Sequence, residues 1–297
     1  KTSTLKMAAS SESKFLEVKI DGTVAIVVMK REPVNSMNLG FWSALLANLN
    51  ELEATKGVRS LIYMSGLRRN VFTAGNDIRE LYAPMTSKER HQKFWIAQTT
   101  FLSRLYKSPL ATIACVRGAC PAGGCILALC CDYRIMADVH SSKIGLNEVA
   151  LGISPPLYWC KVMERLIGHG KATRYLTNAS MLDRNEALSV GMIDEIVPIE
   201  DMLVASFRAA NFFIKMPKGG YALTKYRMRG DLADAWEAYA IEEAKETWKV
   251  LSSKKVVKSL GAVLAKLSKK SPNASSGRAT KANAAGRRSR QIHRSRL

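Results

Sequence analysis

The stretch from residue 110 to residue 129 constrains the fold more than any other part of the sequence. A continuous apolar run at 110–116 leads into a loop of small residues at 118–124, and a nearly all-apolar helical pattern follows. Strands that are apolar on both faces are typical of a sheet covered on both sides, whereas half-exposed strands alternate in polarity. The sequence therefore predicts a buried strand, a tight turn and a buried helix.

The same alternation of strand and helix patterns extends before and after this stretch. Apolar residues recur at helical spacing in two long segments, and short apolar runs indicate strands elsewhere. An α/β layered fold with a buried sheet is the architecture that this alternation predicts. The segments are helices at 39–55 and 86–107, a strand pair within 15–30, and single strands at 58–65 and 133–137.

The second half of the chain has a different pattern. After Pro155 it is almost wholly helical, with a break at 197–198, another at 216–220 and an amphipathic pattern at 231–270. Too little sheet is expected there for a second α/β unit. We therefore predict a disordered N-terminus, an α/β core, a helical C-terminal region and a disordered basic tail, at 1–13, 14–198, 199–270 and 271–297.

Composition narrows the possible function classes. Of the 297 residues 47% are hydrophobic, and no run approaches the ~20 uninterrupted apolar residues of a membrane span. The formal net charge is +20, but residues 268–297 hold nine basic and no acidic side chains, so almost half of the excess lies in the tail. The six cysteines form no CxxC pair and histidine is scarce. We therefore expect buried, reduced thiols and no metal site.

Two loops offer backbone N–H groups to a ligand. The loop at 118–124 opens a helix, where the first N–H groups have no internal partner and lie at the positive end of the helix dipole. The loop at 74–77 precedes a short helix expected at 77–82 and has the same properties. Such groups stabilise a carbonyl oxygen that gains negative charge. Each loop taken alone also fits an ordinary tight turn.

Glu148 is a lone carboxylate beside a strongly apolar stretch at 149–159. Burial among apolar side chains disfavours the charged form, which raises the pKa of a carboxyl toward the range useful for acid–base catalysis. The alternative is an ordinary carboxylate at a helix start. Together with the two loops, Glu148 predicts an enzyme that stabilises an oxyanion and moves one proton nearby.

In their order along the chain, these motifs resemble those of the crotonase (enoyl-CoA hydratase/isomerase) superfamily. Within it they are most similar to the mitochondrial-type Δ3,Δ2-enoyl-CoA isomerases. The resemblance implies a crotonase-like (ClpP/crotonase) α/β fold of repeated ββα units with a C-terminal helical trimerisation region. It covers about 15–270, and the residues that carry it lie at 33–38, 72–78, 118–125, 131–134 and 144–152.

The resemblance also implies a site and a reaction. The backbone N–H groups of Asn76 and Gly123 would form an oxyanion hole for the thioester of an acyl-CoA. Hydratases of the superfamily carry another Glu three residues after the oxyanion glycine, where this chain has Ile126. Water addition needs two such groups, whereas one carboxylate suffices to remove and return a proton. The implied reaction converts a 3-enoyl-CoA to the trans-2-enoyl-CoA, with Glu148 moving the proton from C2 to C4.

Further residues are candidates for binding the substrate. Because coenzyme A is part of the substrate, no separate cofactor is expected. Asn147 and the segment at 155–159 are expected to line the acyl site. The phosphates of coenzyme A need cations nearby, and Arg68 and Arg69 are candidates in addition to Lys30 and Arg31. For Asn76 only the N–H is assigned, because the family usually has a small or aliphatic residue there. The expected substrate-binding residues are Ala74, Gly75, Asp77, Ile78, Asn147, Pro155, Trp159, Lys30 and Arg31.

Two rival functions stay open at this point. One is another crotonase reaction, either enoyl-CoA hydration or acyl-CoA thioester hydrolysis. The other is RNA binding, which some relatives of this fold show and which would use the basic tail. The tail has no aromatic side chain and no recognisable nucleic-acid module, so nucleic acid is not the partner we expect.

The C-terminal region also predicts an oligomeric state and a cellular location. The amphipathic stretch at 231–270 has more apolar positions than one surface helix needs, which together with the resemblance predicts a homotrimer or a dimer of trimers. Ser295-Arg296-Leu297 resembles the Ser-Lys-Leu signal, which predicts binding to a peroxisomal import receptor and a peroxisome or glycosome matrix location. The alternative is the mitochondrial matrix, which would require a leader upstream of Lys1.

Overall fold

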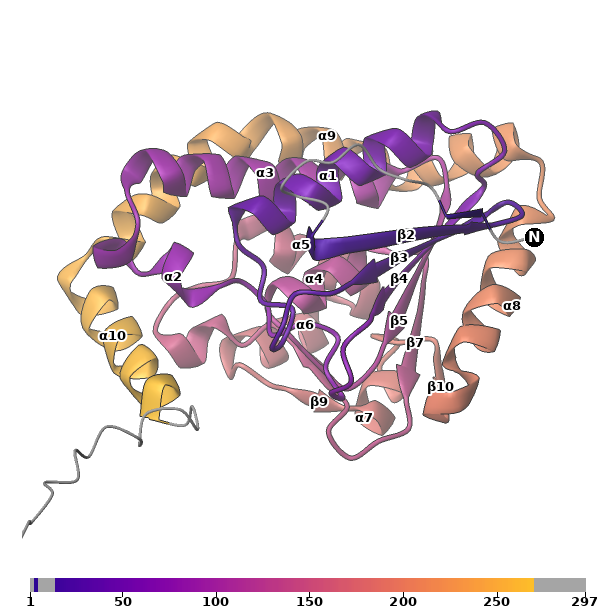
Figure 1. The fold of residues 1–297 in the computed structure, drawn as a ribbon. Coiled ribbons are helices and arrows are strands. Elements are labelled where there is room, and N and C mark those ends of the chain that lie inside the picture. The colour runs from indigo at the N-terminus through magenta and orange to yellow at the C-terminus, as the bar shows by residue number, and fades with distance from the viewer. Residues whose placement is uncertain (1–2, 5–13, 270–297) are drawn as a thin grey trace, which may run out of the picture.

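A seven-stranded sheet forms the centre of the computed structural model, which describes residues 3–4 and 14–269 (Figure 1). The strand order is β1-β2-β3-β4-β5-β7-β10, parallel from β3 to β10, with β1 and β2 antiparallel at one edge. The strands are β1 Ser3–Thr4, β2 Leu16–Asp21, β3 Val24–Met29, β4 Ser60–Ser65, β5 Ala111–Val116, β7 Tyr133–Ala137 and β10 Glu195–Val197.

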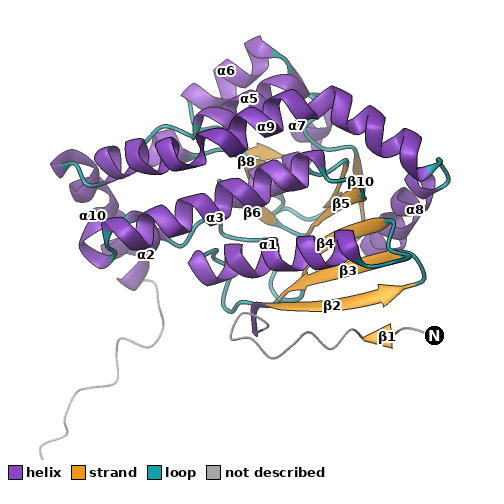
Figure 2. Ribbon diagram, turned by 90° about the horizontal axis from the view of Figure 1, so that it is seen from above, coloured by secondary structure: helices purple, strands orange, loops and turns teal. Residues whose placement is uncertain are grey.

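Helices cover the sheet on both faces (Figures 1 and 2). On one side lie α1 Leu39–Ala54, α3 Lys88–Lys107 and α9 Lys218–Leu251, and on the other lies α8 Met202–Ile214. Side chains of β3 alternate between two hydrophobic clusters, with Val27 packed on the first side and Ile26 on the α8 side. Burial on both faces explains the continuous apolar runs, and the predicted α/β layered fold is confirmed.

A small second sheet lies at one end of the first. Its strands are β6 Ala119–Pro121, β8 Lys143–Gly145 and β9 Leu182–Asp183, of which β6 falls inside the loop of small residues. The fully buried helix α4 Gly123–Cys130 follows β6 directly. The remaining short elements are α2 Ile78–Leu81, η2 Ala83–Met85, η3 Glu148–Leu151, α5 Leu157–Ile167, α6 His169–Thr177, α7 Arg184–Ser189 and η4 Ile199–Asp201.

The C-terminal helices differ in their bounds from those expected at 231–270. The helix α9 already begins at Lys218, because Pro217 suits the start of a helix and packing against α3 outweighs the helix cost of Gly219 and Gly220. It ends at Leu251, and a separate helix, α10 Lys254–Lys269, follows. The hydroxyls of Ser252 and Ser253 donate to the carbonyl oxygens of Trp248 and Val250 at 2.7 Å each, which competes with continuation of the helix.

A buried ion cluster fixes α9 to the end of the sheet. The Asp132 carboxylate accepts from Lys225 Nζ at 2.7 Å, from Arg229 Nη1 at 2.9 Å and from the Tyr221 hydroxyl at 2.7 Å. It also accepts from the Thr112 backbone N–H at 2.8 Å. Burial alone would raise the pKa of Asp132, but the two neighbouring cations and these hydrogen bonds hold it below its ordinary value.

The chain ends are described only in part. Within 1–13, Ser3–Thr4 pairs with β2, which the sequence analysis did not expect, and the predicted tail at 271–297 with Ser295-Arg296-Leu297 lies outside the described residues. Among the helices that the structure describes, none is long and apolar enough to cross a membrane. All six cysteines are free, and five are buried. No group of metal-binding side chains occurs in the described ranges.

Candidate active site

Three loops meet where the two sheets join, and backbone hydrogen bonds hold them together. Val71 forms a parallel bridge with Ala119, and the Phe72 N–H donates to the Ala119 carbonyl oxygen at 2.9 Å. Pro121 is paired with Gly145 through β6 and β8, and the Ala122 N–H donates to the Gly145 carbonyl oxygen at 2.9 Å. The loops that carry Asn76, Gly123 and Glu148 are therefore parts of one connected framework.

The two expected oxyanion-hole residues are in contact. A Cβ added to Gly75, whose φ is +81°, would lie 3.4 Å from the Gly123 nitrogen, and one added to Gly123 would lie 2.9 Å from Asn76 Oδ1. Ala122 has a φ of +50°, a strained conformation for a residue with a side chain, and it is the last residue before α4. Within the described residues, neither the Asn76 nor the Gly123 N–H donates to a protein acceptor. Both remain available to a ligand oxygen.

The side chain of Asn76, for which no role was expected, lies in a buried polar network. Its Oδ1 accepts from Trp42 Nε1 at 3.0 Å, and its Nδ2 donates to Gln98 Oε1 at 2.7 Å. Trp42 comes from α1 and Gln98 from α3, and both are fully buried. The amide is thus held from both sides beneath the glycine loop, which fixes the peptide that carries the Asn76 N–H.

Glu148 is the first residue of η3, directly after the loop that follows β8. Its side chain is 5% exposed, and neither carboxylate oxygen has a hydrogen-bond partner among the described residues. Burial raises the pKa of Glu148 to about 7, opposed only by its own backbone N–H. A carboxyl group with this pKa can accept and return a proton near neutral pH.

Glu148 lies in the wall of a largely apolar cavity of about 980 Å³. Ile126, which the resemblance places where hydratases carry another Glu, is fully buried in α4. Most residues expected from the sequence share this cavity with Glu148. They are Ala74, Asn76, Asp77, Ile78, Asn147, Pro155 and Trp159.

Lys30 and Arg31 are not among the residues that line the cavity, and their expected role at the CoA phosphates stays a prediction. Lys30 is paired with Glu17. Arg31 donates to Asp77 Oδ2 at 3.0 Å and to the Ser36 hydroxyl at 2.6 Å, so its charge is already neutralised locally. Asp77 lies 46 residues from Arg31 in the sequence, so local spacing does not reveal this ion pair.

Asp77 has mainly a structural role in this arrangement. It is the N-cap of α2, where its carboxylate accepts from the Arg79 backbone N–H at 3.1 Å. Burial alone would raise the pKa of Asp77, but hydrogen bonds from Arg79 and Arg31 hold it below its ordinary value. Asp77 therefore stays ionised and positions the loop that contains Asn76. The other exposed arginines considered, Arg68 and Arg69, also lie outside the cavity lining.

The sequence analysis did not identify the C-terminal wall of the cavity. One face of α9 contributes residues at helical spacing, and α10 adds Val263, Leu264 and Leu267. The helix α10 is attached to η3, which begins at Glu148, because the Ser259 hydroxyl donates to the Leu151 carbonyl oxygen at 2.8 Å. The amphipathic pattern was visible, but it did not show which surface the apolar face covers. The α9 residues are Tyr239, Glu243, Glu246, Thr247, Val250 and Leu251.

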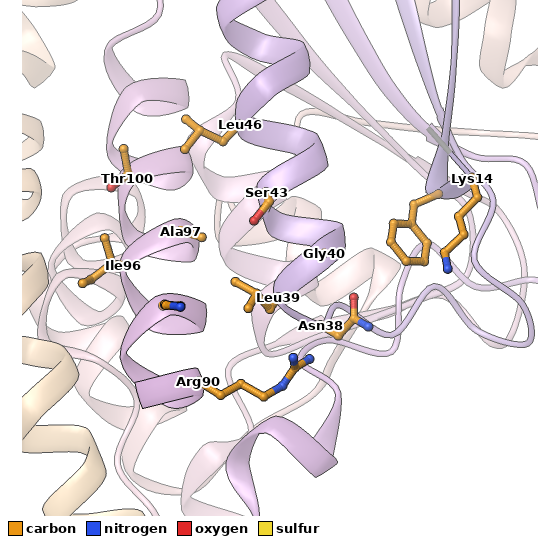
Figure 3. A pocket seen from close by; sticks show the side chains of 12 residues that line it. Lys14, Asn38, Leu39, Gly40, Ser43, Leu46, Arg90, Ile96, Ala97 and Thr100 are labelled. Atoms are coloured by element: carbon orange, nitrogen blue, oxygen red, sulfur yellow. The ribbon is translucent and has the colours of Figure 1, made fainter. Parts of the chain in front are cut away.

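A second cavity of about 680 Å³ lies between α1 and α3, away from Glu148 (Figure 3). Its wall includes Lys14, Lys93 and Arg90, of which Arg90 is bound to Glu80 at 2.6 Å. The rest of its wall includes apolar side chains such as Leu39 and Ile96. None of the site residues expected from the sequence lies in it.

Comparison with known proteins gives one consistent family. Residues 19–274 match the family model of enoyl-CoA hydratase/isomerase. Human mitochondrial enoyl-CoA delta isomerase 1 is 38% identical over 219 residues, which cover 74% of this chain and 72% of that protein. The rat mitochondrial enoyl-CoA delta isomerase 1 is 36% identical over 263 residues, which cover 88% and 89%.

Solved structures agree with this result. The crystal structure of human mitochondrial delta3-delta2-enoyl-CoA isomerase has a TM-score of 0.83 at 35% identity, covering 86% of this chain and 98% of that one. The enoyl-CoA hydratase from Bacillus halodurans has a TM-score of 0.76 at 22% identity, covering 84% and 99%, which is a likeness of fold. The crotonase-like fold expected from the motifs is confirmed. The chain belongs to the enoyl-CoA hydratase/isomerase family.

Proposed function

We propose that this protein is a Δ3,Δ2-enoyl-CoA isomerase that acts in the β-oxidation of unsaturated fatty acids. The observation that carries the proposal is Glu148, a buried carboxyl group with a pKa of about 7 in an apolar cavity that Asn76 also lines. The names of the human and rat relatives support the same activity.

The proposed reaction transfers one proton within the substrate. The thioester oxygen of a 3-enoyl-CoA accepts from the Asn76 and Gly123 N–H groups, and the ionised Glu148 removes a proton from C2. The electron pair of the C2–H bond delocalises over C1 to C4 as a dienolate, whose oxygen charge the two N–H groups stabilise. Glu148 then returns the proton to C4, which leaves the double bond between C2 and C3. Each donor of such a hole is typically worth ~3 to 4 kcal/mol.

Ile126 argues against hydration as the main reaction. Adding water to a 2-enoyl-CoA needs a second group to hold and activate the water, and α4 offers an apolar side chain at that position. Because Glu148 alone accepts and returns the proton, the reaction needs no cofactor, and coenzyme A enters only as part of the substrate.

One product assay separates the candidate reactions. Purified protein is incubated with a trans-3-enoyl-CoA or with a trans-2-enoyl-CoA, and the products are analysed by chromatography and mass spectrometry. Isomerisation leaves the mass unchanged and produces the conjugated thioester, hydration adds one water, and thioester hydrolysis releases free coenzyme A. We expect rapid isomerisation and very slow hydration. Efficient formation of 3-hydroxyacyl-CoA or of free coenzyme A would contradict the proposal.

Where the protein acts remains a prediction. The names of the human, rat and mouse relatives place those proteins in mitochondria, which fits the mitochondrial alternative. No comparison supports the peroxisomal address, and Ser295-Arg296-Leu297 lies outside the described residues. A fluorescent reporter fused to residues 271–297, with and without Leu297, tests it. A reporter that stays cytosolic in both forms would remove the peroxisomal address.

A further inference from the structure

The turn that carries Glu148 is held mainly by its own backbone. In η3 and just after it, the Gly152 N–H donates to the Val149 carbonyl oxygen at 3.0 Å. The Ile153 N–H donates to the Glu148 carbonyl oxygen at 3.3 Å. Val149, Ala150 and Gly152 are exposed, so one side of the turn faces solvent. The Glu148 carboxylate has no hydrogen-bond partner among the described residues, and its place therefore depends on the turn.

One hydrogen bond joins this turn to a distant part of the chain. Ser259, in α10, donates its hydroxyl to the Leu151 carbonyl oxygen at 2.8 Å, across 108 residues of sequence. The other hydrogen bonds of 148–153 within the described chain stay inside that range or reach the adjacent Asn147. The attachment of the turn by hydrogen bonding thus depends on a single side chain.

Ser259 does not bond as serines inside helices often do. Such a hydroxyl commonly donates to the carbonyl oxygen four residues earlier, as Ser268 of the same helix does to Leu264 at 3.0 Å. Ser259 donates to η3 instead, and the two elements are in contact there. A Cβ added to Gly152, the C-cap of η3, would lie 3.4 Å from Ser259 Oγ. The bond is therefore a link between elements and not a local feature of α10.

The helix that carries Ser259 is itself packed against the core. Val256 and Leu260, on either side of Ser259 in the sequence, are 5% and 0% exposed. The helix α10 also contacts α2 (Figure 2), where a Cβ added to Gly261 would lie 3.2 Å from the hydroxyl oxygen of Tyr82, the C-cap of α2. Ser259 is thus presented to η3 from a helix that is fixed on both sides of it.

We propose that Ser259 is a positioning residue for Glu148: its hydrogen bond holds η3 against α10 and keeps the carboxyl group in the wall of the acyl cavity. The proposal rests on the proposed function, because it concerns the same proton transfer. An exposed turn with few backbone hydrogen bonds opens more readily than the core, and one added hydrogen bond lowers the open population. Catalysis is sensitive to such openings, since a shift of about 1 Å in a reacting group can cost about 10²-fold in rate.

Hydrogen exchange tests the link without any turnover. Exchange is followed by mass spectrometry on the peptide that covers 148–153, in the full-length wild-type protein and in Ser259→Ala. Alanine favours a helix more than serine does, so α10 stays folded in the variant. We expect exchange of the Gly152 and Ile153 amides, which are bonded within the turn, to become about fivefold faster, while exchange in α3 is unchanged.

Kinetics test the consequence for proton transfer. In Ser259→Ala we expect kcat on a 3-enoyl-CoA to fall about five- to tenfold with little change in KM, because the base is misplaced while the cavity still binds substrate. The pKa seen in the pH dependence of kcat/KM should also fall, since a carboxyl group that meets solvent more often is less desolvated. A residue that only stabilises the fold would leave this pKa at its wild-type value.

Two further variants separate the hydrogen bond from its surroundings. Ser259→Thr keeps a hydroxyl at the same helix position, so the exchange rate and kcat stay near their wild-type values. Lys258→Ala changes the preceding residue of α10, which is exposed and lies outside the cavity lining, and it leaves both quantities unchanged.

The proposal fails if either the exchange rate at 148–153 or kcat is the same in Ser259→Ala as in the wild-type protein. It also fails if Ser259→Thr loses as much as Ser259→Ala, because the hydroxyl would then not be the group that matters. A wild-type protein without isomerase activity would contradict the proposed function, whereas the exchange measurement, which needs no substrate, still decides whether Ser259 holds the turn.

Discussion

Glu148 carries a carboxyl group without a hydrogen-bond partner in the described structure, and its pKa determines the pH at which it can act as a base. Only the ionised form removes a proton from C2. Since burial raises this pKa to about 7, the protonated form predominates at lower pH. We predict that kcat/KM falls about tenfold per pH unit below pH ~7 and is constant above it. A pH–rate profile that is flat between about pH 5 and 8 would contradict this.

We predict that Gln98 is a positioning residue for the proposed oxyanion hole, because its Oε1 accepts from the Asn76 amide. Gln98→Met removes that acceptor at similar size. We predict that kcat falls about tenfold with little change in KM, less than the loss of about 10²- to 10³-fold when a hole donor is removed outright. The carbonyl stretch of a bound enoyl thioester, measured by Raman difference spectroscopy, should shift less than in the wild-type protein.

The conservative variant at this position separates positioning from packing. Gln98→Glu keeps the acceptor oxygen and replaces Nε2, which has no partner among the described residues, by a second carboxyl oxygen. It should therefore retain the carbonyl shift that Gln98→Met loses. If both variants leave the shift at its wild-type value, the network around Asn76 does not position the oxyanion hole.

The sequence predicts the reacting groups but not the residues that orient them. The two loops and Glu148 follow from loop chemistry and apolar context, which are local features of the chain, whereas the choice of Asn76 and Gly123 within the loops follows from the family resemblance. The contacts of Trp42 and Gln98 with Asn76 join segments that are 34 and 22 residues apart. Trp42, in the first turn of α1, and Gln98, in the middle of α3, meet Asn76 only because the helices pack side by side, and local spacing carries no information about that contact.

At the scale of elements, the ion cluster around Asp132 anchors the longest helix to the sheet. The Asp132 side chain is 6% exposed and is bound to Lys225 and Arg229. Asp132→Asn leaves two cations without their counter-charge, of which Lys225 is buried. We predict that it lowers the free energy of unfolding by about 3 kcal/mol, measured by urea denaturation.

The control for this variant is Asp231→Asn. Asp231 is paired with Arg165 at 2.8 Å, and both side chains are well exposed. Solvent screens such a pair, so no measurable change in stability is expected. An equal effect of the two substitutions would show that the buried cluster does not anchor α9.

The presence of a helix or strand was easier to predict than the residues at which it begins and ends. The buried strands and the helices α1 and α3 were expected close to their observed bounds, because their apolar periodicity is strong. The single helix expected at 231–270 was wrong in its bounds, since the side chains of Ser252 and Ser253 end α9 locally. This end lets α10 turn back across the cavity, where Ser259 binds the loop after Glu148.

At the scale of the whole molecule, large apolar side chains of both α8 and α9 are exposed in the single chain. Contact with further copies of the chain would remove such apolar surface from water. We predict a homotrimer or a dimer of trimers, which static light scattering measures as three or six times the 32.8 kDa mass of one chain. A monomer at micromolar concentration would contradict it. The exposed residues include Val204, Phe212, Leu223, Met228 and Ile241.

The cavity itself is a property of the whole chain. Its wall combines residues from Pro33 to Ser268, so neither the α/β core nor the helical region forms it alone. Sequence motifs found the part built from short loops. The part built from α9 and α10, including Glu243, depends on how the C-terminal helices return to the core, which no local pattern encodes.

The turnover of Glu148→Gln on a 3-enoyl-CoA tests the central claim most directly. Glutamine keeps the shape of the side chain but cannot accept a proton from C2. We predict that kcat falls by about 10²-fold or more, the effect of removing a general base, while thermal unfolding shows an intact fold. Near-normal turnover by the folded variant would contradict the assignment of Glu148 as the group that moves the proton.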